Sequence, residues 1–473
     1  MKLRSFHRGL MFDRIADWGL DGRSPIENPP SAIPNRQSPI GQIQNPQSKI
    51  HNQKGSVLII VLWVAFGLVS LALYFAHAMS FELRAADQRV GAIEAEAAIV
   101  GAVHYLTNVL ARVDEPGMIP DPQTYRTEGV PVGDATFWFI GRSDRPTPDL
   151  PAFGLVDEAS KLNLNTATRE MLEALPRMTP ELAGAIIDWR DSNEEVTDNG
   201  AESTTYQRLN PAYRCKNTNF ESVAELRLVN GALLDVLYGE DANQNGVLDV
   251  NENDGETATP MDNRDGRLDA GVMEYLTVYS RQSANGTNVS NTAQLQAMLE
   301  AKLSRQRAAQ VMPRVSGVGS VLEFYLRSGL TREEFVQVEG SLIGTNLIGL
   351  VNVNTASEAV LTCIPGIGTA NASKLVSARQ SNADRFSSLA WVKDSLEEAD
   401  ALRAAPYVTG RTYQFSADIA AVGHYGRGYR RVKVVIDTSD GSFAIRYRQD
   451  LTSLGWSLGR QVRDNFLLAK QIR

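Results

Sequence analysis

A single long run of apolar residues stands near the start of the chain. Residues 56–81 contain no Asp, Glu, Lys or Arg, and about 20 apolar residues in a helix are enough to cross the hydrocarbon core of a membrane. After this run, apolar residues recur at spacings of three and four up to Leu110, which is the pattern of an amphipathic helix. Together the two halves predict one helix of roughly 55 residues, half in lipid and half in water. No second apolar run of this length follows.

The charges that flank the apolar run predict its orientation. Residues 1–55 hold eight Lys and Arg against four Asp and Glu, and Lys49 and Lys54 lie next to the run. Because an excess of Lys and Arg stays on the cytoplasmic side, we expect a single span with a cytoplasmic N-terminus and the bulk of the chain across the membrane. An ordinary anchor and a cleaved secretory signal are the alternatives, but the run is long for a signal and no small-x-small site closes it.

The end of the chain alternates apolar and polar residues over short spans. Residues 412–448 show this period of two on both sides of a turn at 439–441, which predicts an antiparallel hairpin. Earlier strands are expected at 135–141 and 152–157. We expect these strands to form one sheet that packs on the soluble half of the long helix, with helical units inserted between them.

Composition narrows the class of protein. Hydrophobic residues make up 43% of the 473 residues and charged residues 22%, which indicates globular domains. The formal net charge of -8 gives no overall attraction to nucleic acid. Cys215 and Cys363 are too few for a disulfide framework or a zinc site, and they either pair or remain buried thiols. Because G-x-S-x-G, Gly-Lys-Ser/Thr and H-E-x-x-H motifs are absent, we expect no enzyme.

Two segments share the pattern x-N-x-N-T-A followed by two short helices. They lie at 162–192 and 351–381, and Thr166 and Thr355 are the expected N-caps. In the second segment the helices are joined by Pro-Gly-Ile-Gly, whose glycines allow a tight turn. The first has Pro-Arg-Met-Thr instead. Both resemble the helix-hairpin-helix motif.

A helix-hairpin-helix unit can bind a DNA phosphate through backbone N–H groups or can serve only for packing and protein contact. Phosphate binding needs several cations on one face. Residues 346–405 hold five Lys and Arg against six Asp and Glu, and this near neutrality favours packing or protein contact.

The clearest chemistry lies between the two segments, at 241–252. This stretch matches D-x-N-x-N-G-x-L-D-x-x-E, the pattern of a calcium-binding loop. Gly246 permits the sharp turn, and Leu248 is expected to anchor the loop in a core. Oxygen donors at this spacing suit Ca²⁺ better than Mg²⁺ or Zn²⁺. The predicted ligands are the side chains of Asp241, Asn243, Asn245, Asp249 and Glu252 and the backbone carbonyl of Val247.

A looser copy follows at 262–269, but it lacks a Glu three residues after its last Asp. Residues 240–274 contain ten acidic residues and two arginines, so their carboxylates repel one another unless cations or solvent screen them. A solvated acidic loop is the alternative for both copies. Only the segment before the first loop, 232–237, looks helical, so we expect an isolated calcium loop and no EF-hand pair. The predicted ligands of the second copy are Asp262, Asn263, Asp265 and Asp269.

The junction before the apolar run carries a resemblance to known families. Lys54-Gly55 directly precedes the run, and this junction and the helix after it resemble the N-terminus of type IV pilins and type II secretion pseudopilins. The resemblance implies that a prepilin peptidase cuts after Gly55, that Ser56 becomes the methylated N-terminus, and that the apolar half packs inside a filament. The leader, 1–55, is expected to be disordered, and it is either real or the product of a start codon placed too far upstream.

The fifth residue after the cut is Ile60, where major pilins usually carry a Glu. That carboxylate neutralises the N-terminal amine of a neighbouring subunit inside an apolar core, where an unpaired charge is costly. A subunit without it cannot pair with a subunit placed ahead, but it can occupy the tip. This absence is known in the K class of pseudopilins (general secretion pathway protein K), which the chain resembles from Gly55 to its C-terminus.

The K-class resemblance implies an α+β fold: a long N-terminal helix packed on an antiparallel sheet, with a large inserted α-helical region that carries helix-hairpin-helix-like units and calcium loops. It implies bound calcium as a structural staple, an inner-membrane anchor with a periplasmic bulk, other minor pseudopilins and the prepilin peptidase as partners, and neither nucleic acid nor a small-molecule substrate. The expected divisions are 1–55, the leader; 56–81, the membrane half of the helix; 82–157, its soluble half and the first strands; 158–240, the first helix-hairpin-helix-like unit; 241–274, the calcium loops; 275–345, a linking segment; 346–405, the second unit; and 406–473, the last strands.

Two other functions remain open from the sequence. A membrane-anchored DNA receptor for uptake would use the helix-hairpin-helix units. A calcium-stabilised adhesion domain on a permanent anchor would need no cut at Gly55. The sequence does not identify exported substrates.

Overall fold

The computed structural model describes residues 56–113, 115–143, 150–255, 257, 261–381 and 388–471. The expected leader, including Gly55, lies outside the described residues. The chain divides into two compact units, one of residues 1–73 and one of residues 74–473.

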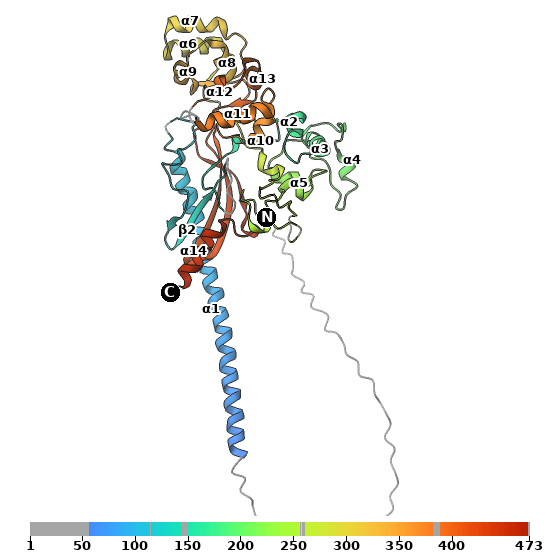
Figure 1. Cartoon of the computed structure of the whole chain (residues 1–473), viewed down its shortest axis with the longest axis vertical. Coiled ribbons are helices and arrows are strands. Elements are labelled where there is room, and N and C mark those ends of the chain that lie inside the picture. Colours follow the sequence, from blue (N-terminus) through green and yellow to red (C-terminus); the bar gives the residue numbers. More distant parts are fainter. Residues whose placement is uncertain are drawn as a thin grey trace, which may run out of the picture. The chain divides into compact units, whose positions relative to one another are not determined.

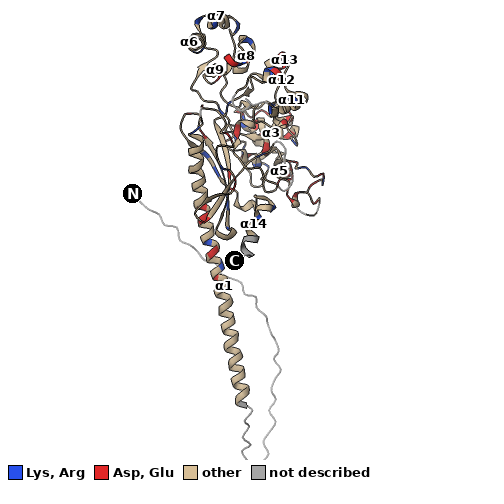
Figure 2. Cartoon of the chain, turned by 60° about the vertical axis from the view of Figure 1, so that its left-hand side comes forward, with Lys and Arg blue, Asp and Glu red and all other residues tan. Residues whose placement is uncertain are grey.

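Helix α1 runs without a break from Ser56 to Leu110, which confirms the long helix that the apolar pattern predicts. Its side chains from Val57 to Met79 are exposed and mostly apolar, and this stretch is tan in Figure 2. Mean hydropathy reaches 2.7 in this helix. Among the described residues, α1 is the one helix long and apolar enough to cross a membrane.

A six-stranded sheet brings together strands from both ends of the unit of residues 74–473. Its order is β1-β2-β10-β11-β12, with β3 paired to β10, and every neighbouring pair is antiparallel. The predicted strand near 135 and the predicted C-terminal hairpin are both confirmed. The strand expected at 152–157 is shorter, because Phe153 makes only an isolated bridge with Ile140. The strands are β1 (Val130–Val132), β2 (Ala135–Ile140), β3 (Val156–Asp157), β10 (Gln414–Gly423), β11 (Arg427–Asp437) and β12 (Ala444–Asp450), and helix α14 (Gly459–Gln471) follows them.

The two faces of this sheet differ in character because side chains alternate along each strand. One face packs on the second half of α1, where Ile99 and Leu106 are fully buried against Ile419 and Val434; burying each such side chain stabilises the fold by roughly 1.5–3 kcal/mol. The residues between them lie on the opposite face, where β10 and β11 carry charges. These charged residues are Asp418, Arg431 and Lys433.

The region inserted between β3 and β10 consists of three units, each closed by a pair of short parallel strands. We call them the first, second and third clasp units, and Figure 1 shows their helices. The second forms within the segment 275–345, which was expected as a linking segment of the helical and α/β region. The first contains β4 (Leu162–Asn163), α2 (Arg169–Glu173), α3 (Pro180–Arg190), α4 (Ser203–Tyr206), α5 (Leu234–Tyr238) and β5 (Leu276–Thr277); the second contains β6 (Thr287–Asn288), α6 (Thr292–Lys302), α7 (Arg305–Val311), α8 (Val321–Ser328), α9 (Arg332–Glu339) and β7 (Leu342–Ile343); the third contains β8 (Val351–Asn352), α10 (Glu358–Thr362), α11 (Gly368–Ser381), α12 (Val392–Ser395), α13 (Glu398–Ala404) and β9 (Val408–Thr409).

The three clasps repeat one hydrogen bond. The residue after each first strand donates its N–H to the last residue of the partner strand: Leu164 to Thr277 at 2.8 Å, Val289 to Ile343 at 3.0 Å and Val353 to Thr409 at 3.1 Å. In each unit an Asn side chain then closes the turn, since the Oδ1 atoms of Asn163, Asn288 and Asn352 accept the N–H two residues on. The x-N-x-N-T-A pattern therefore specifies a strand followed by an Asx turn.

The helix starts were predicted wrongly by two residues. The N-caps of α2 and α10 are Thr168 and Ser357, whereas Thr166 and Thr355 lie inside the preceding turn, where their N–H groups are bonded to the Asn carbonyl. The Thr355 hydroxyl donates instead to Asp157 at 2.6 Å. The helices thus begin only after the Asx turn is complete.

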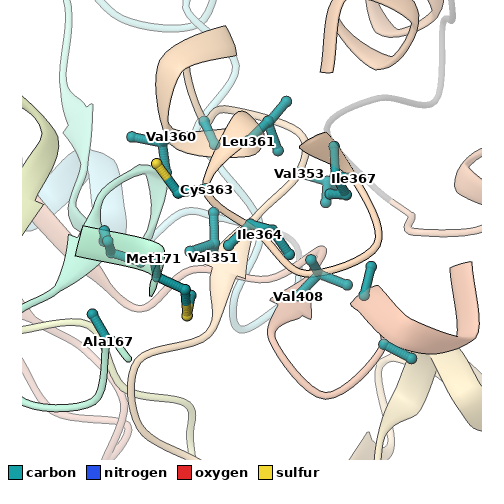
Figure 3. Close-up of a cluster of buried hydrophobic side chains, with 14 of the residues drawn as sticks. Ala167, Met171, Val351, Val353, Val360, Leu361, Cys363, Ile364, Ile367 and Val408 are labelled. Atoms are coloured by element: carbon teal, nitrogen blue, oxygen red, sulfur yellow. The ribbon is translucent and has the colours of Figure 1, made fainter. Parts of the chain in front are cut away.

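The last Arg of the second helix closes both predicted helix-hairpin-helix segments. Arg190 donates to the carbonyls of Leu164 and Ala167, and Arg379 donates to those of Val353 and Ala356. Arginine suits this position because its fork can satisfy two carbonyls at once. The clasp units also share one apolar core. Figure 3 shows Met171 of the first unit beside the core of the third.

Candidate metal-binding loops and assembly helix

The predicted calcium loop at 241–252 is a buried turn. Asp241, Asn243 and Asn245 are buried, as are Val247 and Leu248, so Leu248 anchors the loop in a core as expected. Gly246 has a φ of +73°, and a Cβ on it would lie 2.7 Å from the Arg142 side chain, so glycine is required there. The short η3 helix (Val250–Glu252) ends the loop, and α5 precedes it, as the sequence predicts.

The acidic ends of this loop are held by its own backbone. Asp241 accepts the N–H of Asn245 at 3.0 Å and of Gly246 at 2.8 Å. Glu252 is fully buried, and its two oxygens accept the N–H groups of Ala242 at 2.9 Å and Asp249 at 3.0 Å. The loop therefore curls around its carboxylates and gathers in one turn the oxygen donors that Ca²⁺ takes as ligands.

The carboxylates of this loop are buried close to one another. Burial raises the pKa of Glu252 to about 8, with a further contribution from the negative charges of Asp241 and Asp249. Burial also raises the pKa of Asp241 to about 6, although Arg142 opposes the shift. Both carboxylates are thus disfavoured as anions in the protein alone. Three carboxylates and two amide oxygens in one loop fit Ca²⁺, whose charge would offset this cost.

This pattern predicts an unusual pH dependence for the calcium-free protein. The folded pKa of Glu252 exceeds its ordinary value of 4.5, so between about pH 4.5 and 8 the folded state binds more protons than the unfolded state. Stability contributed by this group should therefore fall as pH rises through that window. We expect urea unfolding in EDTA to show the fall and unfolding in saturating calcium to lack it. A pH dependence that is identical in both conditions would contradict the electrostatic account.

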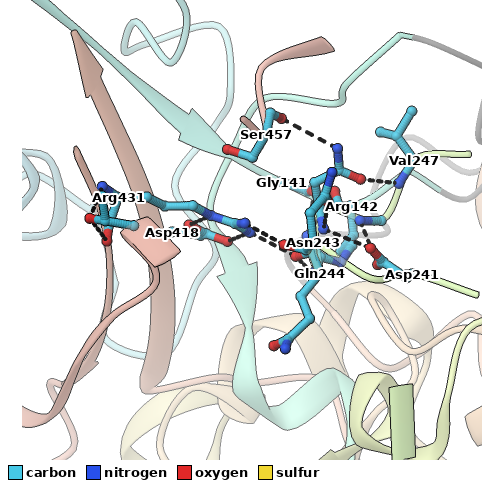
Figure 4. A network of polar contacts seen from close by, with 12 residues as sticks. Gly141, Arg142, Asp241, Asn243, Gln244, Val247, Asp418, Arg431 and Ser457 are labelled. Carbon is cyan, nitrogen blue, oxygen red and sulfur yellow. Dashed lines mark hydrogen bonds and ion pairs between the residues drawn. The ribbon is translucent and has the colours of Figure 1, made fainter. Parts of the chain in front are cut away.

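The loop is gripped by two arginines, as Figure 4 shows. Arg431 of β11 is fully buried, forms an ion pair with Asp418 at 2.6 Å and donates to the carbonyls of Asn243 and Gln244. Arg142, which follows β2, donates to the carbonyls of Gln244 and Asn245 at 3.2 and 3.3 Å. The loop thus joins the inserted region to the sheet.

The second predicted loop, 262–269, differs from the first in exposure. Asn263, Asp265 and Asp269 are exposed and Asp262 is half-buried. Asp262 accepts the N–H groups of Asp254 and Gly255, both at 2.8 Å, and the Asn263 amide lies 3.4 Å from Asp265. The structure brings these residues into one turn, and their role as calcium ligands stays a prediction.

A glutamate that the sequence pattern did not identify completes this second loop. Glu240 is buried, and its two oxygens accept the N–H groups of Asn263 at 3.3 Å and Asp269 at 3.0 Å. Glu252 holds the first loop in the same way. A bridge between Gly239 and Ala270 links the segments that flank the two loops. The first loop was expected to be isolated, but it lies beside the second. The acid that the second copy lacks in sequence is supplied from before the first.

A third acidic group lies in the first clasp unit, and no sequence motif predicted it. The carboxylate oxygens of Asp188, Asp191 and Glu202 lie within 4.8 Å of one another. Glu202 is 1% exposed, and neither of its oxygens has a hydrogen-bond partner in the described chain. Burial raises its pKa to about 7, with the negative charge of Asp188 the next contribution. The spacing of an Asp and a Glu eleven residues apart, as in Asp241 and Glu252, is the signal that could have found it.

The helix-hairpin-helix turn of the third clasp unit is used for internal packing. A Cβ on Gly366 would lie 2.5 Å from the Asp400 carbonyl of α13 and 3.0 Å from the Ala404 nitrogen, so glycine allows α13 to approach. Asn371 of α11 donates to the Asp400 carboxylate at 3.0 Å. A carboxylate beside the turn opposes a phosphate there. This arrangement favours packing over DNA contact.

The soluble half of α1 keeps one apolar stripe exposed. Leu83, Val90, Ile93 and Val100 are 72%, 49%, 70% and 50% exposed, and they follow spacings of seven, three and seven. These spacings fit a heptad seam, which packs against another helix. The buried residues Ala95, Ile99 and Leu106 lie on the other side, against the sheet.

The cysteines are not paired. Cys215 and Cys363 are both free and buried, and burial raises the pKa of each thiol to about 12. Of the two possibilities left open by the sequence, the structure has the buried thiols. Of the processing residues, Ser56 begins α1 and Gly55 lies outside the described residues.

Comparison with known proteins connects this architecture to a family. Residues 155–237 match the family model described as type II secretion system (T2SS), protein K, and residues 348–394 match the helix-hairpin-helix motif. A search of curated proteins found no match. A chain in the crystal structure of the GspK-GspI-GspJ complex from the enterotoxigenic Escherichia coli Type 2 Secretion System is 12% identical, with 75% of this chain and 93% of that chain covered at a TM-score of 0.37.

That structural likeness is too loose to establish a shared arrangement, so the assignment rests on the family match. The matched segment, 155–237, runs from the end of β3 through the first clasp unit to α5, and it includes the Asp188, Asp191 and Glu202 group. This segment of the chain therefore resembles type II secretion system protein K.

Proposed function

We propose that the chain is a minor pseudopilin at the tip of the type II secretion pseudopilus, a structural component for protein export across the outer membrane. The observation that carries this is α1: a single helix that starts at Ser56, runs apolar through Phe81 and then packs on an antiparallel sheet. A filament is built by burying such apolar halves among those of sister subunits, because their exposure to water is costly.

Two features support the position at the tip. Ile60 offers no carboxylate to the N-terminal amine of a subunit ahead, and an unpaired amine in an apolar core is costly. The inserted region between β3 and β10 adds three clasp units to the sheet and helix. An insertion of this size is hard to repeat along a filament, whereas the end of a filament leaves room for it.

The proposal predicts a cut between Gly55 and Ser56. When the full-length chain is co-expressed with a prepilin peptidase, mass spectrometry should find a mature chain that begins with a methylated Ser56. The substitution Gly55→Asp should abolish the cut, because the peptidase recognises the small residue in this position of the resembled family. A chain that stays intact beside an active peptidase would contradict any pilin-like role and would favour the permanent adhesion anchor.

We further propose that the exposed stripe on α1 contacts other minor pseudopilins. Ile93→Lys should leave the melting temperature of the chain unchanged, because Ile93 is 70% exposed, yet weaken co-purification of the partner subunits about tenfold or more, since roughly 1.5–3 kcal/mol of apolar burial is lost.

The matched control is Ile348→Lys, which makes the same change at a residue that is 51% exposed outside α1. It should leave partner binding intact. Equal co-purification of the Ile93→Lys and Ile348→Lys variants would remove the stripe from the interface.

Calcium is proposed as a permanent structural ion, held by Asp241, Asn243, Asn245, Asp249 and Glu252 and the Val247 carbonyl, with the Asp188 group and the loop 262–269 as further places for it. Ion binding there would contribute to folding free energy. The other candidate, a DNA receptor, is favoured only by the helix-hairpin-helix match at 348–394. Salt-sensitive duplex binding in a gel-shift experiment would support that candidate against the pseudopilin.

A further inference from the structure

The charged face of the sheet contains two lysines without close partners. Lys161, which directly precedes β4, is 7% exposed, and its nearest ion-pair partner is Glu158 at 3.9 Å. The ammonium group of Lys433, a half-buried residue of β11, has no hydrogen bond or ion pair within 4.0 Å to any residue that the structure describes. Buried ammonium groups are normally paired, because desolvation of a charge is costly. The lysines of this face therefore lack a close partner, although four carboxylates lie in the same region: Glu158, Asp241, Glu274 and Asp418.

The carboxylates of the same region are already engaged. Glu274 pairs with Arg142 through two contacts, at 2.6 and 3.1 Å. Asp418 pairs with Arg431 through two contacts, at 2.9 and 2.6 Å. Glu158 is then left as a counter-charge for both lysines. Its oxygens also accept hydrogen bonds from the hydroxyls of Thr277 and Ser416.

The two lysines line a common cavity of about 90 Å³ between the sheet and the inserted region. A cavity of roughly 10–15 Å³ can hold one water, so this cavity has space for a small polyatomic ion. Tyr279 also lines this cavity, and its buried hydroxyl has no hydrogen-bond partner in the described chain. Two ammonium groups without a close partner and one hydroxyl without a hydrogen bond thus meet one cavity.

We propose that this cavity binds a small inorganic oxyanion of the sulfate or phosphate class, held by the ammonium groups of Lys161 and Lys433 and by the Tyr279 hydroxyl. Such an anion accepts several hydrogen bonds at once and would neutralise the second ammonium. In the protein alone, the charge of Lys161 and burial lower the pKa of Lys433 to about 8, which is the repulsion that an anion would relieve. The site lies beside the calcium loop and is independent of the role proposed for the helix.

The proposal is tested with sulfate as the probe, since phosphate would precipitate calcium. The full-length chain in detergent is titrated with sodium sulfate at neutral pH by isothermal titration calorimetry, with sodium chloride of equal ionic strength as the blank. We expect saturable binding of one sulfate, weakened about tenfold or more by Lys161→Met and by Lys433→Met. Lys433→Arg should retain sulfate binding, because it keeps the positive charge. If the Met variants do not fold, this variant still tests the proposal.

Lys302→Met is the matched control, because Lys302 is an exposed lysine of α6. It should bind sulfate as the unaltered chain does. No saturable heat up to roughly 10 mM sulfate, or equal binding by the Lys161→Met, Lys433→Met and Lys302→Met variants, would mean an adventitious ion only and would overturn the proposal. A repeat in EDTA separates this site from the calcium loops, since sulfate binding should persist there.

Discussion

Removal of calcium with EDTA should lower the melting temperature of the full-length chain by on the order of 10 °C. A ligand present at about 1,000 times its dissociation constant stabilises the folded state by about 4 kcal/mol, and each kcal/mol shifts the midpoint by roughly 2–4 °C in a domain of this size. The physical reason lies in Glu252 and Asp241, whose buried carboxylates are disfavoured as anions without a cation. The measurement is a thermal unfolding curve in calcium and in EDTA.

Single substitutions show which carboxylate causes the change in melting temperature, and whether its removal raises or lowers that temperature. Glu252→Gln removes a fully buried carboxylate, so in EDTA this variant should melt at or above the unaltered chain, whereas in calcium it should melt below it. Glu202→Gln should give the same pair of results if the group of Asp188, Asp191 and Glu202 also binds calcium. Glu397→Gln, at an exposed glutamate, should change neither curve. A midpoint that does not respond to EDTA would leave the acidic loops merely solvated.

Local periodicity was sufficient for the elements that depend on one segment. The apolar run and its amphipathic continuation predicted a helix of roughly 55 residues, which is the length of α1, and alternation predicted the C-terminal hairpin. The buried turn at 241–252 could also be predicted, because its Asp, Asn and Glu residues lie within twelve consecutive residues, and its binding of calcium stays a prediction. In each case the physical cause, a repeat or a turn, is contained in a short stretch of chain.

The features that the sequence did not reveal depend on residues far apart. Glu240 holds the loop at 262–269 only because the bridge between Gly239 and Ala270 brings the two loops together. The sequence pattern did not predict the second clasp unit, because its first strand is followed by Val-Ser-Asn-Thr-Ala, which departs from the pattern of the other two units. Likewise, nothing local marks Arg431 as the residue that grips the loop from β11.

Replacement of Arg431 by Met should destabilise the chain by about 3–5 kcal/mol, the usual cost of removing one partner from a buried ion pair. Arg431 is fully buried; without it, Asp418 loses both of its contacts to the guanidinium, and the carbonyls of Asn243 and Gln244 lose a donor. The measurement is urea unfolding in saturating calcium. Arg448→Met is the matched control on the neighbouring strand, where an ion pair to Glu96 is about half exposed and contributes little.

A double variant separates the ion pair from the grip on the loop. Asp418→Leu combined with Arg431→Met removes the orphaned carboxylate, so it should recover part of the lost stability, but the two loop carbonyls stay unpaired at roughly 1–3 kcal/mol each. If Arg431 serves to hold the calcium loop on the sheet, both variants should also show a smaller difference between calcium and EDTA than the unaltered chain. Full recovery of stability and of the calcium response in the double variant would show that Arg431 only neutralises Asp418, and the loop would then be held on the sheet by Arg142.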